Sequence, residues 1–210
     1  MAVKILQILG GTRRGQKLET PEDLSVRPML AKVRAAVMNI LMAELPRAAV
    51  LDVFAGTGSL GLEALSRGAS HAVFVETDPT ALRLLRGNLQ RLRFESQAAI
   101  ADADAYRIAD SIPREVGWPF DVVFFDPPYP DMEAPGGPAR LAATIEALRT
   151  RGRLAPEAMI VVHLPVSDLA EAITPPDFDL VDQRLYGRTE IAFLSPREEK
   201  KLLADAGGGS

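Results

Sequence analysis

The feature that most constrains the fold of this chain is an apolar strand that runs directly into a glycine-rich turn and then into a helix. Residues 49–54 (AVLDVF) predict a buried strand, and residues 59–67 predict a helix with apolar residues on one side. Between them, residues 56–61 (GTGSLG) have the spacing G-x-G-x-x-G, which lets a backbone approach a ligand closely. This order is typical of the first unit of a doubly wound α/β fold.

The rest of the chain alternates between the same two hydrophobic patterns. Short apolar runs predict buried strands, and apolar residues three and four positions apart predict helices. The predicted segments are strand 71–76, helix 79–93, strand 98–101, helix 105–112, strand 121–125, loop 130–138, helix 139–150, strand 159–164, a short helix around 167–173, and strands 178–184 and 188–194. This alternation predicts an α/β fold with a mostly parallel, seven-stranded sheet and an antiparallel strand at one edge.

The composition is that of an ordinary soluble protein with one α/β domain. The 210 residues are 47% hydrophobic and 25% charged, and no stretch approaches the roughly 18–20 apolar residues of a membrane span. The absence of cysteine excludes disulfides, thiolate zinc sites and cysteine catalysis. The first residues lack the apolar core of a secretory signal, so we expect a cytoplasmic protein, with a monomer as the default.

A basic extension precedes the predicted catalytic domain. Residues 3–9, a glycine-containing turn and residues 17–19 are typical of a hairpin, and an amphipathic helix follows from Pro28 to about Leu45. The first 47 residues carry eight basic and four acidic side chains, whereas the remainder carries 16 basic and 24 acidic ones. The predicted division is an extension (1–47), a catalytic α/β domain (48–196) and a disordered tail (197–210).

The charge of the extension is what a surface that binds nucleic-acid phosphates requires. A solvated helix face with scattered arginines is the alternative, and charge alone does not separate the two. The candidate phosphate-binding residues are Arg13, Arg14, Lys17, Arg27, Lys32 and Arg34.

The glycine loop and the next strand predict a nucleotide-like cofactor. Glu76 ends that strand and can accept hydrogen bonds from ribose hydroxyls, which suits both NAD and S-adenosylmethionine. Asp52 favours S-adenosylmethionine, because a carboxylate near the loop repels a pyrophosphate and attracts a sulfonium or an ammonium, although it could instead cap a turn. The candidate cofactor-binding residues are Asp52, Phe54, Ala55, Gly56, Thr57, Gly58, Glu76 and Asp104, with Asp102 as the alternative to Asp104 for the adenine amino group. Asp104 directly precedes a predicted helix and could equally serve to cap it.

Residues 126–129 (DPPY), directly after a predicted strand, suggest how an amine could be methylated. An exocyclic base amine is a poor nucleophile, because its lone pair is delocalised into the ring. The Asp126 carboxylate and the Pro127 carbonyl could accept its two N–H bonds, while Pro128 stiffens the loop and Tyr129 stacks on the base. A rigid turn with an incidental aromatic residue is the alternative. No metal is required, and the two histidines, His71 and His163, lie on apolar strands and are expected to be core residues.

With residues 52–58 (DVFAGTG), Glu76 and the DPPY motif in place, the chain resembles the amino-methylating class of Rossmann-like methyltransferases. More narrowly, it resembles the bacterial 16S rRNA guanine-N2 methyltransferase family known as RsmD. This narrower resemblance covers about residues 3–194 and is carried by residues 8–15 (ILGGTRRG), the Arg27-Pro28 and Val33-Arg34 pairs, residues 61–69 (GLEALSRGA), and Tyr186-Gly187.

The resemblance implies S-adenosylmethionine as cofactor and methylation of one guanine in small-subunit rRNA, within a partly or fully assembled particle. It implies that the N-terminal hairpin grips RNA, that residues 126–129 form the acceptor site, and that Asp52, Gly56, Gly58, Glu76 and Asp104 line the cofactor. The chain departs from the family pattern R-P-T-x-x-R-V-R-E, because Met29, Lys32 and Ala35 replace the threonine, the first following arginine and the glutamate.

Three other functions are consistent with parts of the sequence. A DNA adenine or cytosine amino-methyltransferase would use the same DPPY motif, but the short extension leaves little room for a base-reading element. An NAD-dependent oxidoreductase would use the glycine motif. A non-catalytic RNA-binding protein on the same scaffold would keep RNA affinity without Asp126.

Overall fold

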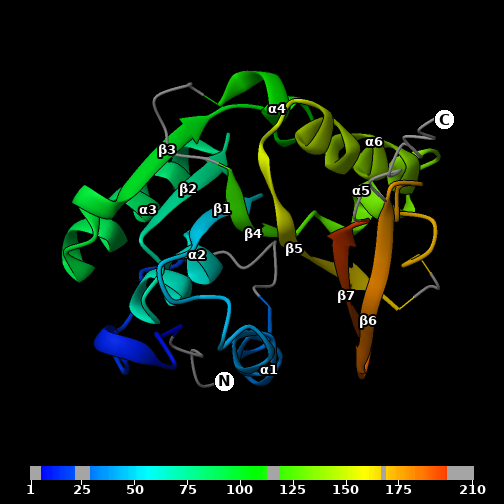
Figure 1. Ribbon diagram of the computed structural model, residues 1–210. Helices are drawn as coiled ribbons and strands as arrows, with labels where there is room; N and C mark the ends of the chain where they lie inside the picture. The colour runs from blue at the N-terminus through cyan, green and yellow to red at the C-terminus, as the bar shows by residue number, and fades with distance from the viewer. Residues whose placement is uncertain (1–5, 22–28, 113–118, 167–168, 198–210) are drawn as a thin grey trace, which may run out of the picture.

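The computed structural model describes residues 6–21, 29–112, 119–166 and 169–197. Its seven-stranded sheet has the order β3-β2-β1-β4-β5-β7-β6 (Figure 1). The strands are β1 (Ala49–Val53), β2 (His71–Glu76), β3 (Ala98–Asp102), β4 (Phe120–Phe125), β5 (Leu154–Pro165), β6 (Phe178–Tyr186) and β7 (Thr189–Pro196). The predicted doubly wound α/β fold is confirmed.

The strand directions also agree with the prediction. Strands β1 to β5 are parallel, whereas β7 runs antiparallel to both β5 and β6. All five residues of β1 are buried, as expected for a central parallel strand covered on both faces. The turn between β6 and β7 contains Gly187, whose φ of 69° is in the left-handed region that favours glycine.

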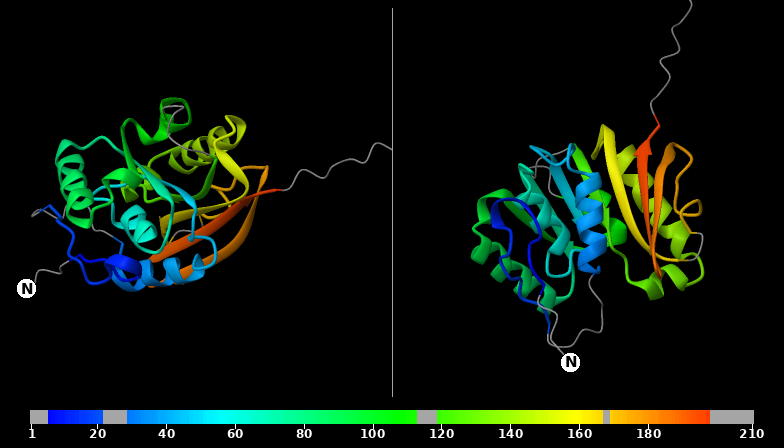
Figure 2. Two further views of the ribbon diagram at one scale, coloured as in Figure 1. Left: turned by 60° about the vertical axis from the view of Figure 1, so that its left-hand side comes forward. Right: turned by 90° about the horizontal axis from the view of Figure 1, so that it is seen from below.

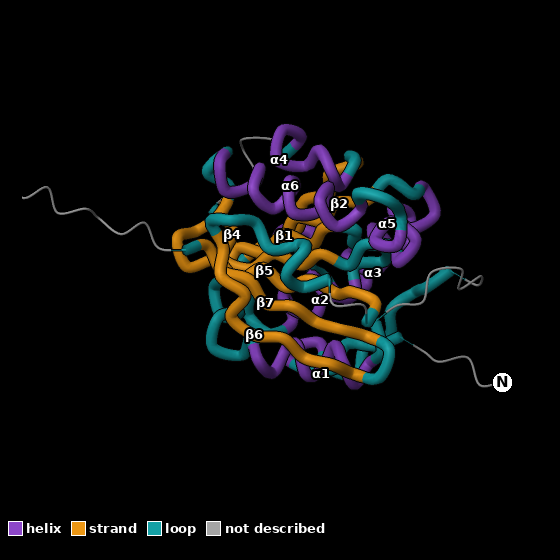
Figure 3. Tube along the Cα trace, turned by 90° about the vertical axis from the view of Figure 1, so that its right-hand side faces the viewer, coloured by secondary structure: helices purple, strands orange, loops and turns teal. Residues whose placement is uncertain are grey.

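Helices cover both faces of the sheet (Figures 2 and 3). Helices α1 (Ala31–Ile40), α2 (Ser59–Ser66) and α3 (Pro79–Leu92) contribute to one hydrophobic core. Helices α4 (Ile108–Ser111), α5 (Tyr129–Glu133) and α6 (Gly137–Thr150) contribute to the other. Three short 3-10 helices complete the description: η1 (Gly11–Arg13), η2 (Glu95–Gln97) and η3 (Ala105–Arg107).

Residues 6–21, which we call the N-terminal strap, lie on the α2 and α3 side of the molecule (Figure 2). The predicted hairpin is reduced to one bridge between Gln7 and Lys17, and η1 occupies the turn. Gly11 allows the strap to pack closely against the end of α2, since a Cβ at this position would lie 1.7 Å from the Ser66 carbonyl oxygen. Ile8 and Leu18 are buried in the same core as the sheet, so the strap packs directly on the catalytic domain.

Several predicted boundaries were wrong. The strand predicted at 159–164 begins at Leu154, and the helix predicted at 139–150 begins at Gly137. Residues 130–133 of the expected loop belong to α5, because Pro130 is tolerated in the first turn of a helix. The helix expected around 167–173 is a turn at 170–173, followed by two prolines that disfavour helix, and 167–168 lie outside the described residues. Helix α1 ends at Ile40 and continues as turns. Of the predicted tail (197–210), only Arg197 lies within the described residues.

Across the described ranges, every helix is too short or too polar to cross a membrane.

Candidate active site

The loops after β1 and β4 meet at the point where the sheet order reverses. Strands β1 and β4 are parallel neighbours, with Val53 opposite Phe125, and the Asp126 amide donates to the Val53 carbonyl oxygen at 3.3 Å. Open α/β sheets bind ligands at such a switch point, beyond the carboxyl ends of the strands. A cavity of about 700 Å³ lies there, and its lining includes Phe54, Gly56, Glu76, Asp104 and Asp126.

The glycine loop has the backbone conformations that its sequence requires. Gly56 and Gly58 have φ values of 55° and 87°, in the left-handed region. Phe54 shares this region, with a φ of 63°, which is uncommon for a bulky residue and is often found at functional sites. Gly61 allows α2 to pack closely on β2, because a Cβ there would lie 2.4 Å from the Phe74 ring. Of these residues, Phe54 and Gly56 line the cavity, together with the predicted Ala55 and Thr57, whereas Gly58 does not.

Two of the acidic residues predicted to bind the cofactor lie at the cavity, in addition to Asp126 of the acceptor loop. Glu76 accepts hydrogen bonds from the amides of Gly56 (2.8 Å), Thr77 (2.7 Å) and Asp78 (2.8 Å), which orients its carboxylate. Asp104 caps η3 through the Tyr106 amide at 2.9 Å and also lines the cavity. Asp102, the alternative to Asp104, is exposed and is not part of the lining.

Asp52 was predicted to bind the cofactor, but it does not line the cavity. Its side chain is buried, 1% exposed, and its Oδ2 accepts the Gly61 amide at 2.9 Å, so the carboxylate holds α2 against the sheet and does not line the cavity. Burial raises the pKa of Asp52 well above its usual range, the Gly61 hydrogen bond opposes this shift, and the negative charges of Asp126 and Glu76 add to it. Asp52 is therefore not the residue that would face a cofactor cation.

The charge of the cavity comes from other acids. Within the described residues, its lining includes no lysine or arginine, and its acidic members are Glu76, Asp78, Asp104, Asp126 and Asp131. A pyrophosphate would meet only negative charge there, whereas a ligand carrying an ammonium and a sulfonium would be attracted. The electrostatics thus disfavour a dinucleotide.

Asp126 is held by a histidine that the sequence analysis assigned only to the core. His163, on β5, is buried as expected, at 6% exposed, but its Nδ1 lies 2.5 Å from Asp126 Oδ1. Its Nε2 lies 3.2 Å from the Tyr129 hydroxyl, which is also 3.2 Å from the Thr189 Oγ1. A polar chain thus connects β7 and β5 to the DPPY loop.

The other DPPY residues take different positions. Pro128 lines the cavity, whereas Pro127 is buried and Tyr129 is half-buried outside the lining. The Tyr129 and His163 rings meet edge to face, with centroids 5.6 Å apart, which fixes the plane of the tyrosine ring.

An aromatic cluster, missed in the sequence analysis, closes one side of the cavity. Tyr106 contacts Phe54 edge to face at 5.2 Å, and the Arg140 guanidinium lies 3.7 Å from its ring centroid. Its hydroxyl donates to Asp131 at 2.9 Å. Burial, followed by the Asp131 hydrogen bond and charge, raises the pKa of Tyr106 to about 12.

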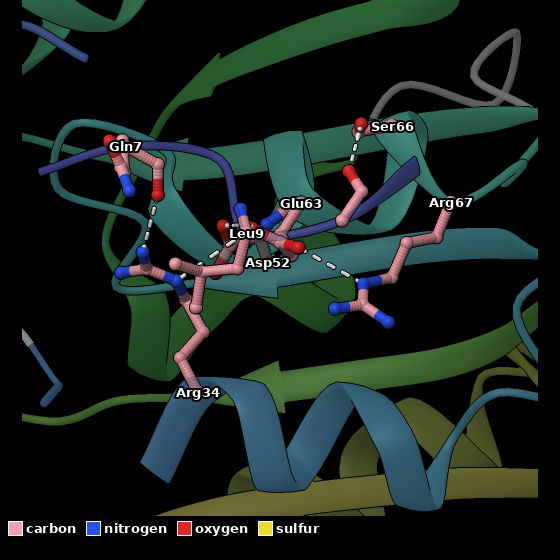
Figure 4. A network of polar contacts seen from close by, with 9 residues as sticks. Gln7, Leu9, Arg34, Asp52, Glu63, Ser66 and Arg67 are labelled. Atoms are coloured by element: carbon pink, nitrogen blue, oxygen red, sulfur yellow. Dashed lines mark hydrogen bonds and ion pairs between the residues drawn. The ribbon is translucent and has the colours of Figure 1, made fainter. Parts of the chain in front are cut away.

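Arg34 was predicted to bind RNA phosphates, but its side chain is not accessible to RNA. Its side chain is fully buried, its Nη2 donates to the Gln7 carbonyl at 2.7 Å, and its Nε lies 3.9 Å from Glu63 Oε2 (Figure 4). Glu63 also accepts from the Leu9 amide and from Arg67 Nε. Burial lowers the pKa of Arg34, and Glu63 partly offsets this effect. The Arg34 side chain extends from α1 toward α2 and the strap, which together cover it.

The other predicted phosphate-binding residues differ in their surroundings. Arg14, Lys17 and Lys32 are exposed, and Arg27 lies outside the described residues. Arg13 is only partly exposed, because its Nε donates to the Leu92 carbonyl at 2.7 Å and its guanidinium lies 5.2 Å from the Phe94 ring centroid.

Comparison with known proteins identifies the family. The sequence model of the family described as "Conserved hypothetical protein 95" matches residues 6–195. The chain belongs to this family. A relative in Escherichia coli (strain K12), named ribosomal RNA small subunit methyltransferase D, is 33% identical over 201 residues, covering 96% of this chain and 94% of the relative.

Two further matches agree with this family assignment. The protein of the same name from Haemophilus influenzae is 34% identical over 184 residues, covering 87% of this chain and 89% of the relative. The solved structure of the Escherichia coli protein yhhF superimposes with a TM-score of 0.76 at 30% identity, covering 93% of this chain and 99% of that one. The resemblance to the RsmD family predicted from the sequence is confirmed.

Proposed function

We propose that this member of the family transfers a methyl group from S-adenosylmethionine to the exocyclic amine N2 of a guanine in 16S rRNA of the small ribosomal subunit. The observation that carries the proposal is that Asp126 and the glycine loop line one cavity. The names of the relatives support rRNA as the substrate class. The DPPY motif supports an amine as the acceptor.

The cavity suits S-adenosylmethionine in size and charge. Its volume of about 700 Å³ is typical of small-molecule sites. Glu76 would accept the ribose hydroxyls, Asp104 the adenine amino group, and the acidic lining would attract the cationic groups. When bound, this cofactor supplies an electrophilic methyl group on a positively charged sulfur.

The acceptor side is formed by the DPPY loop. Asp126 Oδ1 is engaged by His163, which leaves Oδ2 for one N–H of the guanine amine, and the Pro127 carbonyl takes the other. These two bonds direct the nitrogen lone pair toward the methyl group, and Tyr129 stacks on the base. After transfer, the nitrogen loses a proton to the Asp126 carboxylate. Positioning and electrostatics therefore account for the catalysis.

Nucleoside mass mapping tests the proposal. Unmodified 16S rRNA, alone and in small-subunit particles, would be incubated with S-adenosylmethionine and the protein, and we expect N2-methylguanosine in at least one of the two. Asp126→Ala should abolish methylation but still bind S-adenosylhomocysteine, whereas Asp110→Ala, at an exposed acid away from the cavity, should be fully active. Methylation of adenine or cytosine in duplex DNA, with none in rRNA, would replace this proposal by a DNA amino-methyltransferase.

A further inference from the structure

Helix α3 carries a surface of a single charge sign. Between Pro79 and Phe94 the chain has four arginines and no acidic residue, although the whole protein has a net charge of −4. All four side chains are exposed. We call them the arginine face: Arg83, Arg86, Arg91 and Arg93.

The arginine face is not neutralised by neighbouring acids. Among the ion pairs of the described residues, only Arg91 of this set has a partner, Glu19 of the strap. On a helix, residues three and four positions apart are neighbours, so Arg83 lies beside Arg86. Like charges at this spacing destabilise a helix. A solvated helix face usually mixes both signs, so the arrangement indicates a function other than stability.

The N-terminal strap extends the same surface. Arg13 donates to the last turn of α3 at Leu92, and Asn88 holds the strap through its hydrogen bonds with Glu19. The exposed Arg14 and Lys17 therefore lie on a segment fastened along α3 (Figure 2).

This surface begins at the rim of the cofactor cavity. The cavity lining includes Thr20 and Pro21 from the end of the strap, and Thr80 and Ala81 from the first turn of α3. The first arginine of the face is thus within one helical turn of the lining. A polyanion lying on α3 would therefore approach the cavity at the rim formed by the first turn of this helix.

We propose that the arginine face, with Arg14 and Lys17 of the strap, binds RNA phosphates flanking the methylated base. The identity of the RNA rests on the proposed function, whereas the affinity for a polyanion rests on this surface alone. Exposed arginines suit phosphate contacts, which neutralise charge and release counterions.

The test is a salt series of binding to a 16S rRNA transcript, with Arg83→Glu/Arg86→Glu compared with the wild type. We expect the affinity to fall on the order of tenfold or more at ~100 mM salt, and the slope of log K against log[salt] to flatten by about 1.4–1.8 for two lost phosphate contacts. The matched control is Arg151→Glu/Arg197→Glu, which makes the same charge change at exposed arginines beside the amino-terminal end of β5.

Arg83→Glu/Arg86→Glu should bind S-adenosylhomocysteine as the wild type does, which verifies that the variant is folded. If it does not fold, Arg83→Gln/Arg86→Gln is the milder substitution to test. Equal affinity and salt slope in the variant and the wild type would overturn the inference, as would an equal loss in the control. Loss of binding to anionic lipid vesicles, with rRNA binding unchanged, would also overturn it. If the wild type binds rRNA through this surface but methylates none, the proposed function fails and this inference stands.

Discussion

At the scale of single residues, the contact between His163 and Asp126 links the acceptor loop to the body of the sheet. With Nδ1 protonated, the His163 ring donates to Asp126 Oδ1 at 2.5 Å, and its Nε2 can accept from the Tyr129 hydroxyl. An aspartate side chain held in this way keeps one orientation. His163 is therefore a positioning residue for the proposed reaction.

We expect His163→Leu to lower kcat on the order of 10²-fold, because a misplaced acceptor group costs this much, while the Kd of S-adenosylhomocysteine stays unchanged. His163→Asn should recover most of the activity, since its side-chain amide can still donate to Asp126. The measurement is steady-state methyl transfer alongside calorimetric cofactor binding. His71→Asn, at the opposite end of a strand from the cavity, is the control. A leucine variant that keeps its kcat would remove His163 from the mechanism.

Tyr106 gives a prediction for alkaline pH. Its pKa is raised from 10.0 to about 12, so the folded protein keeps the phenol proton where the unfolded chain loses it. This contribution to stability is present below pH 10 and is lost as the pH rises through about 12.

Ultraviolet titration of tyrosinate should show a late phase that disappears in Tyr106→Phe. The phase should move to lower pH in Asp131→Asn, because the negative charge beside the hydroxyl is removed. A late phase that persists in Tyr106→Phe would contradict this assignment.

The site residues that could be predicted are those whose role depends on local sequence. The glycine loop, Glu76 and Asp126 each end a strand, and parallel strands bring such ends together. The burial of His163 was predicted, but its contact with Asp126 was missed, because the two residues are 37 positions apart and the strand is apolar. Asp52 was misplaced because one strand position decides which face a side chain takes. The arginine face of α3 could have been recognised from the sequence, because residues 79–94 contain four arginines and no acidic residue.

At the scale of elements, the Arg34–Glu63 contact joins α1, α2 and the strap (Figure 4). Both side chains are fully buried, and Arg34 Nε and Nη1 have no hydrogen-bond partner among the described residues. Glu63 serves three groups, Arg34, Arg67 and the Leu9 amide, so it is the centre of the network.

We expect Glu63→Leu to destabilise the fold by about 3–5 kcal/mol, because it leaves a buried guanidinium unpaired. Arg34→Met should cost less, since Arg67 and Leu9 still satisfy the Glu63 carboxylate. Urea unfolding of the two variants and of the double variant Arg34→Met/Glu63→Leu provides the measurement. The double variant should be more stable than Glu63→Leu alone, and a purely additive loss would contradict a coupled pair.

Elements with a clear pattern of apolar residues were predicted well, whereas elements whose conformation depends on tertiary contacts were not. The strands of the parallel sheet follow from unbroken apolar runs. The strap has backbone hydrogen bonds of its own, for example from the Ile8 amide to the Gln16 carbonyl, but Ser66 and Glu63, more than 50 positions away, fix it on the domain. Nothing local in the sequence specifies such a partner.

At the scale of the whole molecule, the charges are separated. The cavity lining is acidic, whereas the strap and α3 expose arginines and a lysine. This division suits two ligands of opposite charge, a cationic cofactor and a polyanionic substrate, bound side by side.

We expect S-adenosylhomocysteine at 100 times its Kd to stabilise the protein by about 2.7 kcal/mol, and NAD to have no effect. Although S-adenosylhomocysteine lacks the sulfonium charge, it keeps the ammonium and has no pyrophosphate. Thermal unfolding with each ligand distinguishes the two classes. Protection by NAD alone would restore the oxidoreductase alternative.

Asn88 has a consequence for how the two ligands influence each other. Its buried amide donates to the carbonyls of both Glu19 and Thr57, so one side chain ties the strap to the glycine loop. An RNA that restricts the motion of the strap would, through Asn88, also restrict the motion of the glycine loop, which lines the cofactor cavity. Because such a linkage is reciprocal, the donor must strengthen RNA affinity by the same factor. Under this linkage the protein would bind RNA more tightly when the cofactor site is filled than when it is empty.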